Sequence, residues 1–119
     1  MTAIIIINET HSLLPKQEEL LRERFDDFEL LRVPSRGWTR SEMEKVLKEL
    51  YGRNVVFVSP IPYMVASLSF YAGFARGKDF YGEPGRVFIF HNDRRRKEEI
   101  DGRIISKIDP KGWELIEIG

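Results

Sequence analysis

In the segment IIIINETHSLLP (Ile4–Pro15), four isoleucines are followed at once by four polar residues. A short, continuous run of β-branched residues is typical of a strand that is covered on both faces, as in a parallel sheet. We therefore predict a buried strand over Ala3–Ile7. Open α/β sheets bind ligands beyond the carboxyl ends of their strands, so the polar residues that follow are the first candidates for a site.

Strand and helix patterns alternate along the rest of the chain. Apolar β-type runs predict further strands over Leu30–Val33, Val55–Val58 and 86–91. Apolar residues at helical spacing predict helices that start near Pro15, near Thr39 or Ser41, and near Tyr63. Thr39 with Glu42, or Ser41 with Glu44, forms a capping box for the second helix.

After a turn-rich connection over residues 77–85 and the strand at 86–91, the last part of the chain has a different pattern. Residues 103–109 and 113–118 read as two strands around a tight turn that contains Pro110 and Gly112. We therefore predict one domain over residues 1–119, an α/β fold. It is a Rossmann-like three-layer αβα sandwich, with a mostly parallel sheet and a C-terminal antiparallel β-hairpin. The common doubly wound strand order would place strands 3–7 and 55–58 side by side.

The composition excludes several classes of function. Lys plus Arg and Asp plus Glu are 19 each in 119 residues, so no global field draws the chain to long nucleic acid or an anionic membrane. The absence of cysteine excludes disulfides, thiolate catalysis and Cys-based metal sites, and it suits a reducing cytoplasm. The N-terminus has no export-signal pattern. Residues 54–75 carry no charge, but Pro60 and Pro62 argue against a membrane-spanning helix.

The third predicted helix, from about Tyr63 to Ala75, is apolar nearly all round. Because a sheet covers only one face of a helix, we expect a face with Met64, Leu68, Tyr71 and Phe74 to meet a partner subunit in a two-fold homodimer. Neighbouring helices of the same chain are the alternative cover.

His11 follows the first strand and is one of two histidines in the chain. Its imidazole can give or take a proton near neutral pH, which suits general acid or base catalysis on a phosphate or a carbonyl. The alternative is a histidine that only caps the next helix. Asn8 and Thr10 beside it either orient a ligand or satisfy the turn, and the turn is the simpler role for Thr10.

Ser59 opens the segment SPIP, which follows the strand at 55–58 and leads into an apolar helix. A rigid loop that opens into a helix N-terminus presents backbone N–H groups and a positive dipole to an anion. We therefore take Ser59 as a catalytic candidate, and Pro60, Ile61 and Tyr63 as substrate-binding candidates. The alternative role of Ser59 is that of an N-cap.

Two further segments offer groups that bind nucleotides. Arg36 and Trp38 provide a guanidinium for phosphate and an indole for stacking on a base, although the indole of Trp38 can instead pack on the core. Asn92 and Arg94, at the start of a basic run, are additional substrate-binding candidates, although charge runs usually form solvated turns. The sequence contains no Walker loop, dinucleotide fingerprint or metal-ligand cluster, so we predict neither a cofactor nor a metal.

The strand-end segments NETHSLLPKQ (8–17) and VSPIPYMVASL (58–68), in a chain of this size, resemble the small stand-alone CRISPR-associated ring nucleases. Those proteins have a Rossmann-like fold related to CARF sensor domains. The resemblance implies a homodimer whose two-fold axis passes through a pocket for a cyclic oligoadenylate. It also implies metal-independent cleavage, in which a ribose 2′-hydroxyl attacks the neighbouring phosphate and type III CRISPR signalling is switched off.

On this sequence the resemblance implies catalytic roles for His11 as acid or base, for Ser59 and for Arg36 as a charge stabiliser. Asn8 would contact phosphate or ribose, and Trp38 would stack on a base, as would Tyr63. Two other kinds of function stay open on the sequence alone. One is a non-catalytic nucleotide sensor that acts as a dimer, and the other is an interaction protein that binds no small ligand.

Overall fold

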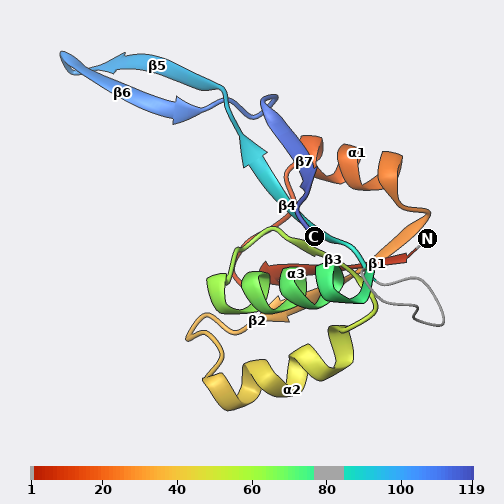
Figure 1. Cartoon of the computed structure of the whole chain (residues 1–119). Coiled ribbons are helices and arrows are strands. Elements are labelled where there is room, and N and C mark those ends of the chain that lie inside the picture. The colour runs from red at the N-terminus through yellow and green to blue at the C-terminus, as the bar shows by residue number, and fades with distance from the viewer. Residues whose placement is uncertain (1, 77–84) are drawn as a thin grey trace.

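The computed structural model describes residues 2–76 and 85–119, with the backbone alone at residues 73–76, 95 and 96. Its elements are β1 (Thr2–Asn8), α1 (Pro15–Arg24), β2 (Asp27–Val33), α2 (Arg40–Leu50), β3 (Asn54–Phe57), α3 (Pro62–Arg76), β4 (Val87–Asn92), β5 (Arg95–Ile100), β6 (Arg103–Ile108) and β7 (Trp113–Glu117) (Figure 1). The turn-rich connection expected over 77–85 lies, except for its last residue, outside the described residues. No helix in the described parts of the chain is long and apolar enough to cross a membrane.

The predicted α/β fold is confirmed by the main sheet. Its five strands have the order β2-β1-β3-β4-β7, and only β7 runs antiparallel to its neighbour. β1 and β3 are neighbours, as the doubly wound order predicts, and Ile6 of β1 lies opposite both Leu31 and Phe57. The carboxyl ends of β1 to β4 therefore meet at one edge of the sheet, where ligands of such sheets bind.

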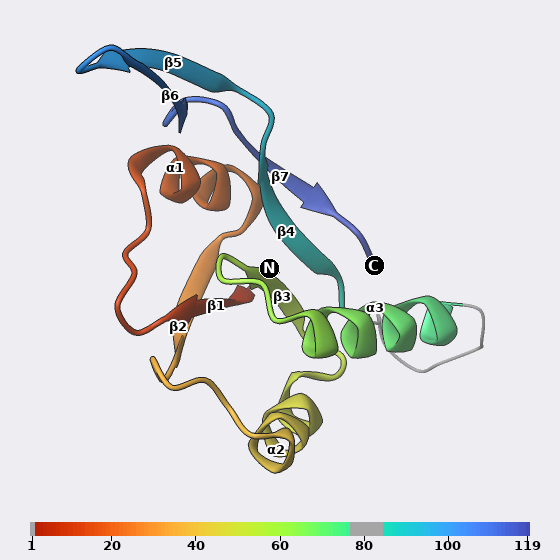
Figure 2. The ribbon, with the colours of Figure 1, turned by 90° about the vertical axis from the view of Figure 1, so that its left-hand side faces the viewer.

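Helices cover both faces of this sheet, with α1 on one side and α2 and α3 on the other (Figure 2). Successive residues of a strand point to opposite faces of the sheet, so the isoleucines of β1 contribute to two hydrophobic cores. The α1 core contains Ala3, Ile5, Leu21, Phe25, Val56 and Phe88. The opposite core includes Ile4, Ile6, Leu47, Leu50, Val55, Phe57, Met64 and Leu68. This arrangement explains why β1 is apolar without alternation.

The α2 helix begins as one of the two predicted capping boxes requires. The amide of Glu42 donates to the hydroxyl of Thr39 at 3.2 Å, and the Glu42 carboxylate accepts the amide of Thr39 at 3.4 Å. Gly52, just after the C-cap Tyr51, has a φ of 85°, which glycine adopts readily, and ends the helix. The N-terminal capping box of Thr39 and Glu42 fixes where α2 begins, next to the edge of the sheet.

The prediction that Met64 and Leu68 of α3 face a partner subunit is wrong, because both side chains are buried against the sheet of the same chain. Met64, Leu68 and Ala72 follow one another at a spacing of four residues, so they form a single stripe that faces the sheet. Tyr71 is half-buried and packs on Tyr51 of the same chain, and the side chain of Phe74 lies outside the described residues. The outer face of α3 instead carries Phe70, which is 76% exposed.

An antiparallel hairpin near the C-terminus is present, as predicted, and strands lie at both predicted places, but the predicted pairing of these two strands with each other is wrong. β7 pairs with β4 in the main sheet, and β6 pairs with β5 in a separate two-stranded hairpin. The hairpin turns at Asp101 and Gly102, whose φ values of 50° and 77° suit a two-residue turn. All side chains of β6 are exposed, and the hairpin projects from the sandwich (Figures 1 and 2). The longest axis of the molecule is 59 Å.

Candidate functional site

A pocket of about 450 Å³ lies at the carboxyl edge of the sheet, between the segments that follow β1, β2 and β3. It is lined by Asn8, Val33, residues 35–38, Met43 and residues 59–63, and we call it the edge pocket. The structure thus brings together most of the predicted site residues, namely Asn8, Arg36, Trp38, Ser59, Pro60, Ile61 and Tyr63. Three segments that are distant in the sequence meet here because parallel strands end at a common edge.

Ser59 links the ends of the two central strands. Its backbone N–H donates to the carbonyl of Ile6 at 3.1 Å, and its hydroxyl oxygen accepts the N–H of Asn8 at 2.9 Å. The alternative role as N-cap of α3 is wrong, because α3 begins three residues later at Pro62 and the hydroxyl is used across the sheet. The hydroxyl is therefore held at a fixed place in the wall of the edge pocket.

His11 stands next to Ser59, with its Nδ1 atom 3.4 Å from the Ser59 hydroxyl oxygen. Its backbone N–H donates to the carbonyl of Asn8 at 3.0 Å, and its own carbonyl accepts a hydrogen bond from Arg32 Nη1 at 2.9 Å. The side chain is exposed and does not line the edge pocket, but it lies beside Ser59, which does. The structure thus brings together two of the three predicted catalytic candidates, which lie in the segments that follow β1 and β3.

Asn8 and Thr10 have different roles. The Oδ1 atom of Asn8 accepts two hydrogen bonds from Thr10, one from the backbone N–H at 3.0 Å and one from the hydroxyl at 2.8 Å. Thr10 thereby closes the turn after β1 and does not line the edge pocket, in keeping with the turn reading. Among the described residues, the Nδ2 group of Asn8 meets no acceptor. It is a donor that a ligand in the pocket can use.

Arg36 lies in the pocket wall but is not a free cation. Its guanidinium donates to both carboxylate oxygens of Glu42 at 3.0 and 2.9 Å, and to the carbonyl of Gly37 at 2.9 Å. The hydrogen bond from Arg36, followed by that from the Thr39 backbone, lowers the pKa of Glu42 to about 2. The same pairing raises the pKa of Arg36. The pair fixes the direction of the guanidinium and neutralises part of its charge.

Glu9 ties the segment after β1 to the segment after β2. Its carboxylate accepts the N–H and the hydroxyl of Ser35, each at 2.7 Å, and these hydrogen bonds lower the pKa of Glu9. Sequence reasoning missed Glu9, Ser35 and Glu42 as parts of the site. Nothing in the local pattern indicates that Glu42, read as a cap residue, also holds Arg36.

Trp38 and Tyr63 give the pocket an aromatic lining. Trp38 is half-buried and packs on the core formed by α2 and α3, so it both faces the pocket and supports the fold. The hydroxyl of Tyr63 donates to Glu44 of α2 at 3.3 Å. The first turn of α3 has no acidic residue, so its N–H groups and helix dipole favour an anion at this end of the pocket.

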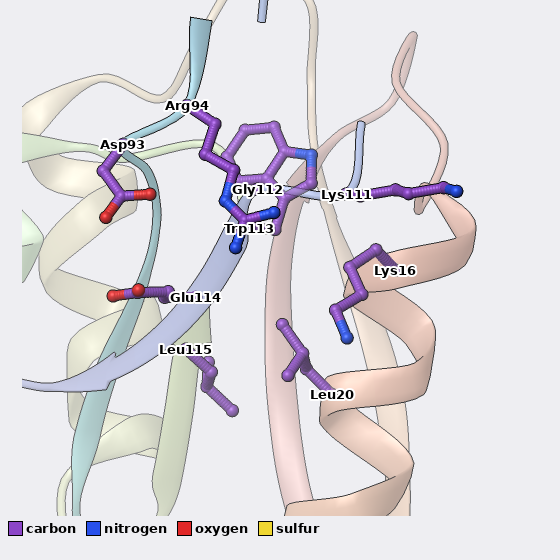
Figure 3. Close-up of a pocket in the computed structure, with 9 residues that line it drawn as sticks. All are labelled: Lys16, Leu20, Asp93, Arg94, Lys111, Gly112, Trp113, Glu114 and Leu115. Carbon is purple, nitrogen blue, oxygen red and sulfur yellow. The ribbon is translucent and has the colours of Figure 1, made fainter. Parts of the chain in front are cut away.

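Asn92 and Arg94 lie outside the edge pocket. Asn92 is only 8% exposed, and both ends of its amide are occupied: Nδ2 donates to the carbonyl of Asp109 at 2.6 Å, and Oδ1 accepts the N–H of Arg94 at 3.0 Å. The Arg94 side chain lines a different pocket (Figure 3). Asn92 thus organises the base of the hairpin.

The edge pocket offers hydrogen-bond donors, an aromatic wall and a helix N-terminus, and His11 stands beside the Ser59 hydroxyl in its wall. These groups are suited to a phosphate ester. In the described residues, no group of three or more His, Asp or Glu side chains is placed to hold a metal ion. No protein-family model, no curated protein and no solved structure matches this chain. Its function must therefore be inferred from the geometry of the site.

Proposed function

We propose that the chain is a ring nuclease, which binds a cyclic oligoadenylate, most readily cyclic tetra-adenylate, and opens it in the cytoplasm. The observation that carries the proposal is the edge pocket itself. It joins the Ser59–His11 contact of 3.4 Å to Arg36, Asn8 and the start of α3. These are the residue types that the resemblance assigns to phosphate, ribose and proton transfer.

In the proposed reaction a ribose 2′-oxygen attacks the adjacent phosphorus and the bond from phosphorus to the 5′-oxygen breaks. The proton of the 2′-hydroxyl passes to a base, and the 5′-oxygen takes up a proton as it leaves. His11 serves one of these transfers through Nε2, while Ser59 orients the ring through Nδ1. A 3.4 Å contact is long for a hydrogen bond, and such contacts tighten when substrate binds.

The other groups of the pocket act on the phosphate and on a base. Asn8 Nδ2, the N–H groups at the start of α3 and Arg36 stabilise the negative charge that grows on the phosphoryl oxygens. Because Glu42 holds the guanidinium of Arg36 at two points, the donor is already oriented before the substrate arrives. Trp38 and Tyr63 provide aromatic surface for an adenine.

The size of the pocket supports a homodimer. A volume of about 450 Å³ suits a ligand of ordinary drug size, whereas a ring of four nucleotides is much larger. Two copies of the chain, with their edge pockets facing across a two-fold axis, would enclose such a ring. Phe70, exposed on the helix whose first turn lines the pocket, is the apolar anchor that we assign to this contact.

A non-catalytic sensor is the second candidate function, and the pairing of Arg36 with Glu42 favours it. A guanidinium whose charge is partly neutralised binds phosphate but stabilises a transition state less than a free one. In that case the chain would bind the ring and leave it intact.

The experiment that tests the proposal follows cyclic tetra-adenylate by chromatography in the presence of EDTA. We expect the wild-type chain to consume the ring, and His11→Ala to lower turnover by about 10²-fold or more. His91→Ala is the matched control, because His91 is the other histidine and lies exposed on β4, away from the edge pocket. Binding of the ring without any product would support the sensor, and equal turnover in both variants would remove His11 from the mechanism.

A further inference from the structure

A second pocket lies where the base of the hairpin meets α1 (Figure 3). Its volume is about 510 Å³, and it is lined by Lys16, Leu20, Asp93, Arg94 and residues 111–115. We call it the hairpin-base pocket. Its size falls within the range of roughly 300–1,000 Å³ that is usual for small-molecule sites.

One wall of this pocket is a turn that Asn92 holds in place. The Asn92 amide bonds to the carbonyl of Asp109 and to the N–H of Arg94, and the N–H of Asp109 donates to the carbonyl of Arg94 at 3.1 Å. The carboxylate of Asp109 accepts the N–H of Lys111 at 2.9 Å. The backbone that carries Arg94 and Lys111 is therefore fixed by hydrogen bonds from a nearly buried side chain.

Gly112 allows Arg94 to lie across this turn. A Cβ atom at position 112 would stand 2.6 Å from the Cβ of Arg94 and 2.6 Å from the Oδ1 of Asn92, which is closer than van der Waals contact. A glycine at this position is thus needed for the approach of the Arg94 side chain to the pocket.

The charges in this pocket are arranged without neutralising one another. Arg94 and Lys111 form no ion pair within the described parts of the chain, although Asp93 and Glu114 line the same pocket. Asp93 and Glu114 lie on one side, with Lys16 and Lys111 on the other and Arg94 beside Trp113 between them (Figure 3). Lys16 pairs with Glu19 of α1 at 3.4 Å, outside the pocket lining. Arg94 and Lys111 lie near two carboxylates without pairing with them, which fits a ligand with groups for both charges.

We infer that the hairpin-base pocket binds a nucleoside monophosphate. The phosphate contacts Arg94, Lys111 and Lys16, the base lies against the indole of Trp113, and the exocyclic amino group of the base donates to Asp93 or Glu114. This site shares no residue with the edge pocket and does not depend on the proposed nuclease activity.

The two tryptophans allow ligand binding to each pocket to be followed separately. The chain has only Trp38, in the edge pocket, and Trp113, in the hairpin-base pocket, so a ¹H–¹⁵N spectrum contains two indole signals. Either Trp38→Phe or Trp113→Phe removes one indole signal and thereby assigns both signals. We expect adenosine 5′-monophosphate to shift the Trp113 signal in a saturable way, and expect Lys111→Ala, on an exposed turn, to weaken this binding by about tenfold.

Lys45→Ala, on the exposed face of α2, is the control and should bind as the wild type does. Adenosine and inorganic phosphate test the nucleoside and the phosphate parts of the ligand one at a time, and each should bind more weakly than the monophosphate. The inference is overturned if millimolar monophosphate leaves the Trp113 signal in place, if inorganic phosphate binds equally well, or if Lys111→Ala has no effect. A shift confined to the Trp38 signal also overturns it.

Discussion

Replacement of Ser59 by alanine tests how the two central strands support the edge pocket. The hydroxyl of Ser59 is the acceptor for the N–H of Asn8 at 2.9 Å, and it lies 3.4 Å from Nδ1 of His11. In Ser59→Ala the half-buried N–H of Asn8 loses its acceptor, which costs about 1 kcal/mol of unfolding free energy. The unfolding entropy of 119 residues is about 0.25 kcal/mol/K, so the melting temperature should fall by about 4 °C.

The same substitution should also lower turnover of cyclic tetra-adenylate, because the ring of His11 loses the group that orients it. Calorimetry gives the melting temperature, and chromatography gives the turnover. Ser67→Ala is the matched control, since among the described residues the Ser67 hydroxyl bonds only to the carbonyl of Tyr63 within α3, at 2.8 Å. It should change stability by no more than about 0.5 kcal/mol. If Ser59→Ala retains both the melting temperature and the turnover of the wild type, the assigned role of Ser59 is wrong.

Three further predictions concern the surroundings of the two pockets. The pKa of Glu42 is about 2 and lies below its usual value of 4.5, so the stability it contributes is present above that usual value and is lost as the pH falls toward 2. The difference in melting temperature between wild type and Glu42→Gln should therefore be constant near neutral pH and shrink in acid; a difference that persists in acid would contradict the pairing with Arg36. Gly112→Ala should destabilise the fold by about 1–3 kcal/mol in chemical denaturation, because its Cβ would meet Arg94 and Asn92, and an unchanged unfolding midpoint would argue against that close approach. Phe70→Glu should convert a dimer to a monomer in sedimentation experiments without loss of helical signal, whereas a wild-type chain that is already monomeric would refute the dimer.

The sequence predicts the sandwich well because its cores depend on short-range patterns. The unbroken isoleucines of β1 are informative because both sheet faces are covered, and the spacing of apolar residues in α2 is a local property. Pairing between strands is not local. The turn at 109–112 exists, yet it directs the chain back to β4 and does not close a hairpin with β6.

The missed strand β5 is rich in charge, which disfavours a strand assignment. Asp101–Gly102 was the signal that could have identified it, since this dipeptide between two runs of equal length is typical of a hairpin turn. The strand ends did indicate where polar side chains gather. The ion pair of Arg36 with Glu42 and the buried role of Asn92 depend on tertiary contacts that no local pattern contains.

The most direct test of the proposed function is the identity of the product formed from cyclic tetra-adenylate in ¹⁸O-labelled water with EDTA. Attack by a ribose 2′-hydroxyl predicts linear products that end in a 2′,3′-cyclic phosphate and contain no ¹⁸O. An intact ring after long incubation, or a first product whose phosphate carries ¹⁸O, would contradict it.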